Sequence, residues 1–184
     1  VAKCLDPNDY ICYVFGPAKR IFHKKNIANL VDIEISNFKQ ELIAHNPEIV
    51  ITSTGWNLVE LSAVKVAKAR NIKTISLLDH WSNYRERFGY PKEHWQNNLP
   101  DEVWIGDNYG IELAKSLEFP TEKLKQITNF YFEEIKEYAK KFSKSISAQK
   151  RILWLSQPTS THAKKQHRNT NFWGYTEHGV IKDI

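Results

Sequence analysis

The stretch "SLLDHWSNYRERF", residues 76–88, carries the residue types most suited to chemistry in this chain. An apolar run ends on Asp79, and His80 follows it directly. A partly buried carboxylate or imidazole is readily tuned toward neutral pH, so either side chain could act as a general base. Arg85 and Arg87 add forked donors that suit a phosphate or a carboxylate. The stretch therefore indicates a catalytic or ligand-binding rim.

A structural interpretation of the same stretch stays open. Asp79 could cap the next turn, and the two arginines could be solvated or paired with Glu86. The functional interpretation is favoured for Asp79, His80 and the arginines, because so many polar types gather in one place. For Trp81, Tyr84 and Glu86 we keep the interpretation that they only pack or cover a strand end.

A second candidate is the loop "TSTGW", which runs straight into a predicted helix. It offers small and aromatic residues: Ser53, Thr54, Gly55 and Trp56. Its hydroxyls and backbone N–H groups could hold a phosphate, a sugar hydroxyl or a carboxylate. It could equally be a plain turn, in which Gly55 supplies an unusual backbone angle and Asn57 the helix cap.

Several well-known motifs are absent from the sequence. There is no Walker motif, no G-x-G-x-x-G and no serine-hydrolase elbow. The spacing of Cys4 and Cys12 matches neither a zinc pair nor a redox motif, and no histidine–acid set has a metal spacing. We therefore expect no metal and no cofactor.

Two later polar residues also follow apolar runs. Asp107 and Asn129 are candidates for substrate binding because each comes where a predicted strand ends. Asp107 or Asn108 could also cap the helix that follows, and capping is the favoured role at this position.

All these candidates depend on an alternation of apolar runs with helical stretches. The expected strands cover residues 10–15, 28–34, 48–54, 73–79, 102–107, 125–129 and 151–157. The expected helices cover residues 17–25, 36–45, 57–70, 108–118 and 130–146, with one further helix from Thr176. Most of the strands are continuously apolar, which is typical of burial on both faces. The pattern predicts an α/β fold with a doubly wound, Rossmann-like parallel sheet that binds ligands at the carboxyl ends of its strands.

The bulk composition is that of a globular protein. The 184 residues are 41% hydrophobic and 26% charged, and no run of about 18 apolar residues suggests a membrane span. Residues 151–184 hold five Lys and Arg against two acids, so residues 1–150 keep only +2 of the net charge of +5. This balance argues against nucleic-acid binding by the main body. The beginning of the chain shows no secretion signal, so a cytoplasmic location is expected.

A charged helix followed by "SKSISAQK" predicts a domain boundary. Residues 1–147 would form the Rossmann-like domain, and residues 148–184 a linker with the first strand and helix of a second domain. One strand and one helix cannot bury a core by themselves. We therefore expect a truncated second domain whose remainder, a C-terminal domain, is missing.

Four segments carry a resemblance over roughly residues 10–158: "PEIVITSTGW", "LLDHWSNYRERF", "LPDEVWIGDNYGIELAKS" and "RILWLSQP". The chain resembles bacterial polysaccharide and capsule biosynthesis proteins, similar to the N-terminal half of glycosyltransferase B-fold (GT-B) enzymes and of sugar-nucleotide 2-epimerases. The resemblance implies a cleft between two Rossmann-like domains, with the acceptor bound by the first domain and the sugar nucleotide by the second. It implies no catalytic metal.

The resemblance also assigns residues and partners. Asp79 or His80 would be the catalytic base that activates an acceptor hydroxyl. The resemblance places Ser53, Thr54, Gly55, Trp56, Asn83 and Arg87 in the cleft as substrate-binding residues. The residues themselves, by chemistry or by position after a strand, add Arg85, Asp107 and Asn129 to the substrate-binding candidates. The partners would be a nucleotide-sugar donor and a carbohydrate acceptor, with no nucleic acid, no transmembrane segment, and peripheral membrane association left open. Without the donor domain, this chain alone would not catalyse transfer.

Two alternatives remain open. One is a small-anion or sugar-binding module of flavodoxin-like topology that has no catalytic activity. The other is a sugar-nucleotide 2-epimerase or hydrolase, which would need a further acid pair in the missing domain.

Overall fold

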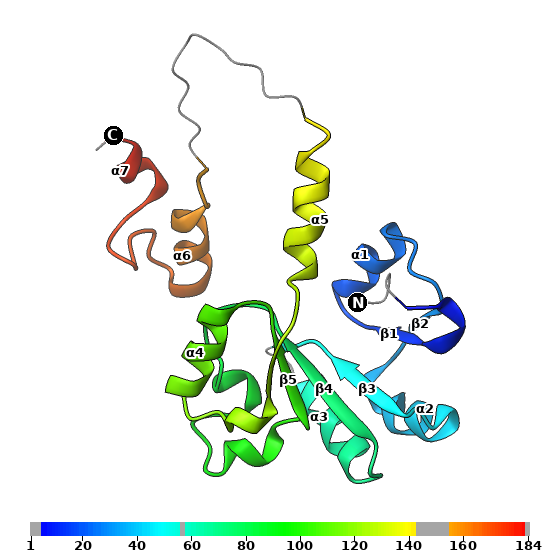
Figure 1. Cartoon of the computed structure of the whole chain (residues 1–184). Helices are drawn as coiled ribbons and strands as arrows, with labels where there is room; N and C mark the ends of the chain where they lie inside the picture. Colours follow the sequence, from blue (N-terminus) through cyan, green and yellow to red (C-terminus); the bar gives the residue numbers. More distant parts are fainter. Residues whose placement is uncertain (1–4, 56–57, 143–154, 183–184) are drawn as a thin grey trace. The chain divides into compact units, whose positions relative to one another are not determined.

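The computed structural model describes residues 5–55, 58–142 and 155–182 and divides the chain into two compact units (Figure 1). The first unit is Val1–Phe142 and the second is Ser143–Ile184. The expected α/β class with parallel strands is confirmed. Among the described residues, no helix has the length and apolarity needed to cross a membrane.

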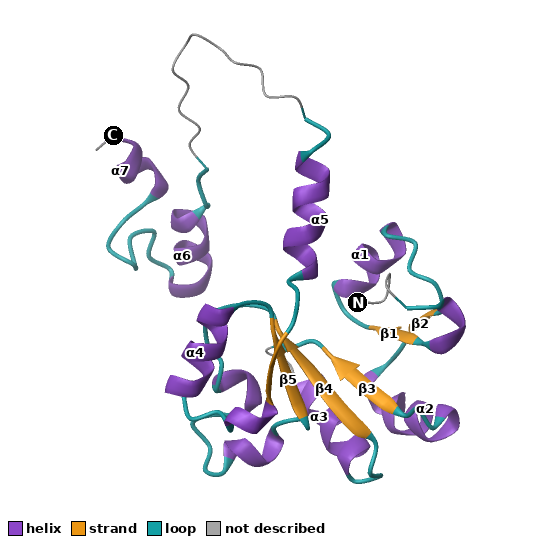
Figure 2. Ribbon diagram, viewed as in Figure 1, coloured by secondary structure: helices purple, strands orange, loops and turns teal. Residues whose placement is uncertain are grey.

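The first unit contains two parallel sheets (Figure 2). The larger sheet joins four strands in chain order: β3 (Ile49–Thr52), β4 (Lys73–Leu78), β5 (Glu102–Ile105) and β6 (Leu124–Gln126). The smaller sheet pairs β1 (Cys12–Val14) with β2 (Leu30–Asp32). All six strands are shorter than predicted, because residues at one or both ends of each predicted run lie in loops or turns.

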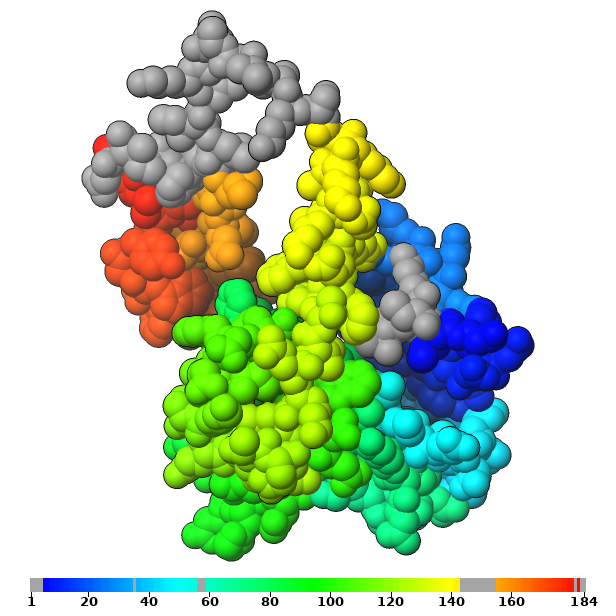
Figure 3. Space-filling view, viewed as in Figure 1, coloured from blue at the N-terminus to red at the C-terminus, as the bar shows by residue number. Residues whose placement is uncertain are grey.

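Five helices are described in the first unit: α1 (Ala18–Lys24), α2 (Phe38–His45), α3 (Leu58–Lys68), α4 (Asn108–Ser116) and α5 (Phe130–Ala139). Each begins within two residues of its predicted start. Short 3-10 turns occupy Pro7–Asp9, Ile35–Asn37, Glu86–Phe88, Trp95–Asn98 and Thr121–Lys123. Helix α5 protrudes from the body of the first unit and buries none of its side chains (Figure 3).

The larger sheet packs one face against helices. Val103, Ile105 and Leu124 on that face form a core cluster with residues of α4, and Val50 joins Ala67 of α3. On the opposite face of β3, Ile49 is 46% exposed. The expected doubly wound arrangement is wrong for this sheet, because its strands follow one another in chain order and right-handed crossovers between them place the helices on one face. The burial on both faces that the apolar runs predicted is seen for β4 but not for β3.

Buried aromatic side chains anchor the long connection between β4 and β5. Phe119 contacts Tyr84, Phe88 and Trp95 with ring centroids 4.9–6.1 Å apart. Tyr84 and Phe88 are each 1% exposed, so the expected packing role of Tyr84 is confirmed. Such aromatic contacts stabilise a connection that has no long helix of its own, and they hold the residues after β4 in place.

The polar groups at the amino ends of the strands bond to one another. The Thr74 N–H and hydroxyl both donate to the Asp101 carboxylate at 2.8 Å, and the Asp101 N–H donates back to Thr74 Oγ1 at 3.0 Å. Partial burial raises the pKa of Asp101, but the Thr74 hydrogen bonds and nearby lysines outweigh burial and hold it below its usual range. Lys68 and Lys123 donate to the backbone carbonyls of Leu99 and Pro100.

The second unit corrects two predictions. It contains α6 (Thr159–His167) ahead of α7 (Glu177–Lys182), whereas a single helix from Thr176 was expected. The part of the predicted strand 151–157 that is described, from Leu155 onward, is not a strand, and residues 151–154 lie outside the described residues.

A tertiary contact accounts for α6. The Ser160 N–H and hydroxyl donate to the Glu177 carboxylate at 2.8 and 2.7 Å. These bonds lower the pKa of Glu177 to about 2. They satisfy the start of a helix whose own sequence offers no cap, because Pro158 precedes it.

Candidate functional site

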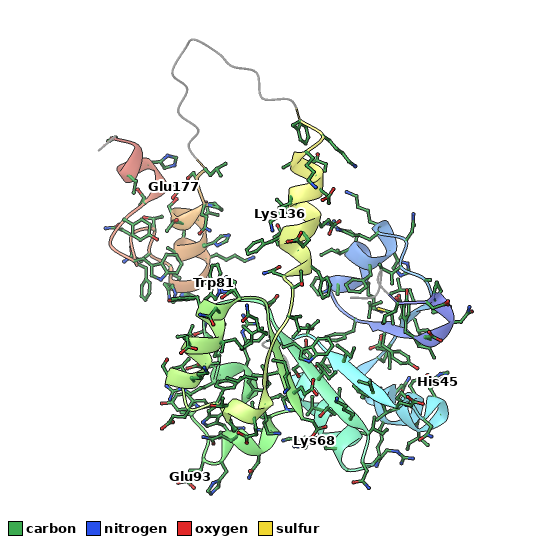
Figure 4. The ribbon with its side chains drawn as sticks, viewed as in Figure 1. His45, Lys68, Trp81, Glu93, Lys136 and Glu177 are labelled. Atoms are coloured by element: carbon green, nitrogen blue, oxygen red, sulfur yellow. The ribbon has the colours of Figure 1, made fainter. Side chains whose placement is uncertain are left out.

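The polar loops predicted from the sequence lie at one end of the larger sheet. All four strands run parallel, so the segments after β3, β4, β5 and β6 leave from the same edge. Figure 4 shows Trp81 on the side of the first unit from which α5 and Lys136 rise. Lys68 and Glu93 lie at the opposite end of the unit. The carboxyl edge of the sheet is therefore the candidate site.

Arg87 joins the loop after β3 to the loop after β4. Its Nη1 donates to the Thr54 carbonyl at 2.7 Å and lies 3.1 Å from Thr54 Oγ1. The same nitrogen is 3.4 Å from Asp79 Oδ1, and Nε is 3.4 Å from the Ser82 carbonyl. The Arg87 side chain is only 10% exposed. Its donors are directed at the protein, so Arg87 positions the two loops.

The loop "TSTG" is also largely bonded within the protein. Thr54 Oγ1 donates to the Leu77 carbonyl at 3.0 Å, and Ser53 Oγ lies 3.4 Å from Glu60 Oε1. A Cβ on Gly55 would meet Glu60 Oε1 at 2.7 Å. The end of the Glu60 side chain would have to shift to admit a Cβ there. The unusual backbone angle expected of Gly55 is wrong, because its φ is not in the left-handed region.

Glu60 makes this loop less suited to binding an anion. Its Oε2 is buried and has no hydrogen-bond partner among the described residues. A carboxylate at the start of α3 opposes the binding of a second anion there. The predicted residue Trp56 and the predicted cap Asn57 lie outside the described residues.

Asp79 and His80, the two predicted catalytic residues, are both exposed at the end of β4. The Asp79 side chain is 74% exposed. His80 Nδ1 is 3.1 Å from Ser82 Oγ, and its other ring nitrogen, Nε2, has no protein partner in the described part of the chain. Asn83 is exposed beside them and adopts a left-handed φ of 56°, which asparagine tolerates well.

Asp107 uses both of its carboxylate oxygens. Oδ1 accepts the Gly110 N–H at 2.6 Å, so the favoured capping role is confirmed. Oδ2 accepts the Trp81 Nε1–H at 2.9 Å. Trp81 in turn meets Tyr109 edge to face, with centroids 6.1 Å apart.

Trp81 and Tyr109 were missed as site residues by the sequence analysis. The Trp81 side chain is 51% exposed and Tyr109 is 67% exposed, so Trp81 is not the packing residue that was expected. A tryptophan placed directly after Asp79 and His80 at a strand end was the available signal.

A hollow of about 820 Å³ lies beside these loops, at the ends of β5 and β6. Its lining combines amide, hydroxyl and apolar side chains: Gly106, Gln126, Ile127, Thr128, Asn129, Phe132, Glu133, Ile135 and Lys136. Asn129 Oδ1 accepts the Phe132 N–H at 3.2 Å and caps α5. The Asn129 amide also reaches Gly106, where a Cβ would lie 2.9 Å from its Nδ2.

Arg85 is not brought together with the other predicted residues. Its guanidinium carbon lies 4.0 Å from the centre of the Tyr90 ring. One guanidinium nitrogen is 3.9 Å from Glu118. Arg85 therefore stabilises the far side of the β4–β5 connection.

Tyr84 and Gly110 support the floor of the site. Burial, followed by the nearby Asp107 carboxylate, raises the pKa of Tyr84 to about 12, so its hydroxyl stays neutral. A Cβ on Gly110 would lie 2.6 Å from Ile105 Cγ2 and 2.9 Å from the Tyr84 hydroxyl. Only glycine fits beneath the start of α4.

Among the described residues, no group of three or more His, Cys, Asp and Glu side chains could hold a metal ion. Comparisons with models of protein families, with curated proteins and with solved structures found no match.

Proposed function

We propose that this chain is the acceptor-side half of a glycosyltransferase-like enzyme of bacterial surface polysaccharide biosynthesis. In this proposal the first unit is the N-terminal Rossmann-like domain of a GT-B-type fold. The observation that carries the proposal is the exposed Asp79–His80 pair at the end of β4, on the same edge of the sheet as a polar hollow and two exposed aromatic rings.

The proposed base is His80. For Nε2 to accept a proton, Nδ1 must carry one and donate it to Ser82 Oγ, 3.1 Å away. Nε2 would then take the proton of an acceptor hydroxyl while that oxygen bonds to the anomeric carbon of the donor sugar. The nucleoside diphosphate leaves with the electrons of the broken bond. Asp79, held by Arg87, would orient the hydroxyl or the imidazole.

The hollow suits a carbohydrate acceptor. Amide groups of Gln126 and Asn129 and the hydroxyl of Thr128 can bond sugar hydroxyls, while Ile127 and Phe132 offer apolar surface to the ring. Neighbouring strands are about 4.8 Å apart, so β4 and β6 are separated by about 10 Å. An acceptor of more than one sugar ring could therefore reach from the hollow to His80.

One alternative is weakened by the geometry. A small-anion module would use the loop after β3, but the Glu60 carboxylate stands against Gly55 in that loop. Thr54 Oγ1 is already bonded to the Leu77 carbonyl and approached by Arg87. These contacts leave few donors for a phosphate.

The test is NMR titration of the ¹⁵N-labelled chain with methyl pyranosides and disaccharides, compared with uridine diphosphate. We expect saccharides to shift the amide signals of His80, Thr128 and Asn129, with a Kd in the range of about 1 mM and above. Uridine diphosphate should bind weakly or not at all, because the donor half supplies its site. Binding of uridine diphosphate with a Kd below about 10 μM, or no response to any saccharide, would contradict the proposal.

A further inference from the structure

Two aromatic rings stand exposed next to the proposed base. Trp81 is 51% exposed and follows His80 directly in the chain. Tyr109, in the first turn of α4, is 67% exposed. Their ring planes meet at 88°, so the pair forms a corner. Large exposed aromatic surface beside polar groups commonly marks a place where a ligand binds.

The Trp81 ring of this corner is held by hydrogen bonds. The only donor of the indole, Nε1–H, is bonded to Asp107 Oδ2 at 2.9 Å. Asp107 is fixed in turn, because its Oδ1 caps α4 by accepting the Gly110 N–H at 2.6 Å. A ring that is already ordered loses little conformational entropy when a ligand stacks on it.

The surrounding charge restricts the ligand. The exposed Asp79 carboxylate is two residues from Trp81, and Asp107 touches the indole itself. Two carboxylates disfavour a phosphate or another anion on these rings. A neutral ring with an apolar face and hydroxyls at its rim suits both the aromatic surface and the acids, and a pyranose has this shape. The polarised C–H groups of a pyranose complement the negative face of an aromatic ring.

We propose that Trp81 and Tyr109 form a stacking platform for one pyranose ring of a carbohydrate ligand. The statement that this ligand is the acceptor rests on the proposed function. The stacking itself does not depend on catalysis, and it can be tested by binding alone.

The experiment follows the indole N–H signal of Trp81 in the ¹⁵N-labelled chain. Methyl β-glucopyranoside and methyl β-galactopyranoside are compared with sorbitol, an open-chain polyol, and with inorganic phosphate. Pyranosides should shift the Trp81 indole signal in a saturable way, whereas sorbitol and phosphate should leave it in place. An equal response to sorbitol, or a response to phosphate only, would overturn the platform.

Alanine variants provide a second test of the platform. Trp81→Ala and Tyr109→Ala should each weaken pyranoside binding about fivefold. Trp173→Ala and Tyr175→Ala, which remove exposed rings in the second unit, should leave it unchanged. If Trp81→Ala does not fold, Tyr109→Ala and the indole signal of the unmodified chain still decide the question. Loss of affinity in the controls but not in Trp81→Ala and Tyr109→Ala would contradict the proposal.

The two proposals can fail separately. Pyranoside binding that depends on Trp81 and Tyr109 but leaves the His80 signal unmoved would support the platform and count against an acceptor bound at the base. Saccharide shifts at His80 and Asn129 that persist in Trp81→Ala would support the acceptor site and overturn the platform.

Discussion

The two ends of the larger sheet carry similar polar residues and use them differently. At the amino ends of the strands, Thr74 and Asp101 bond each other, and Lys68 and Lys123 donate to backbone carbonyls. At the carboxyl ends, Asp79 and His80 face solvent with part of their hydrogen-bonding capacity unused. The first end stabilises the fold, and the second end is available to a ligand.

The difference indicates which polar residues of this chain can bind a ligand. Polar residues that satisfy one another contribute to stability and have little left for a ligand. Arg87 shows that the carboxyl end also needs internal bonds, because it ties two loops together from a nearly buried position.

Arg87→Ala should have the largest effect, a loss of about 3 kcal/mol, because a nearly buried cation that donates to Thr54 and Ser82 is removed. Urea unfolding measures the change. Arg85→Ala is the matched control and should cost about 1 kcal/mol, since Arg85 makes a ring contact and a long ion pair. Equal losses in the two variants would show that Arg87 does not tie the loops.

Thr74→Val should cost about 1–2 kcal/mol, because Thr74 is fully buried and its hydroxyl exchanges two hydrogen bonds with Asp101. Saccharide binding, followed by NMR, should stay unchanged. Thr128→Val at the exposed carboxyl end should change stability by less than about 0.5 kcal/mol. A loss of binding in Thr74→Val would mean that the two ends are not separate in function.

Asp101 should make the free energy of unfolding depend on pH in the acid range. Its pKa is lowered in the folded state, so its contribution to stability is present above the unfolded pKa of about 4. That contribution is lost as the pH falls from about 4 through the lower folded value. Urea unfolding between about pH 6 and pH 3 should show a shallower acid loss in Asp101→Asn than in the unmodified chain. Identical slopes in the two proteins would refute this role.

His80→Gln should change the free energy of unfolding least, by less than about 0.5 kcal/mol, because the side chain is exposed. It should weaken saccharide binding about two- to tenfold through the loss of a hydrogen bond to a hydroxyl group. NMR titration measures the affinity and urea unfolding the stability. A large loss of stability without any change in affinity would show that His80 stabilises the fold and does not bind the ligand.

Much of the fold followed from local pattern. Each of the six described strands lies at a predicted apolar run, and the helix starts agree closely. The capping role of Asp107 was also predictable, since it depends on neighbours in the chain. Tyr84 was expected to pack, although its ring contacts Phe119 from a distant part of the chain. Local pattern did not reveal α6, because its first turn is capped by Glu177, 17 residues away from Ser160.

The candidate site was predicted less completely. Arg87 was expected to meet a ligand, but it bonds Thr54, 33 residues earlier in the chain. Trp81 was expected to pack, but its indole is held outward by Asp107, 26 residues later. Spacing in the sequence carries no signal for contacts of this kind, because they exist only once separate strands lie side by side.

The sequence by itself determined which residues form strands and helices, and that the polar segments after the strands would share one edge of a parallel sheet. Hydrophobic periodicity and chain direction are sufficient for that. Only the tertiary structure decided how each polar group is used. The nearly buried Arg87 side chain bonds other parts of the protein, and the Glu60 carboxylate lies next to Gly55. His80, Trp81 and Tyr109 stay exposed and available to a ligand, because no described segment of the first unit covers them.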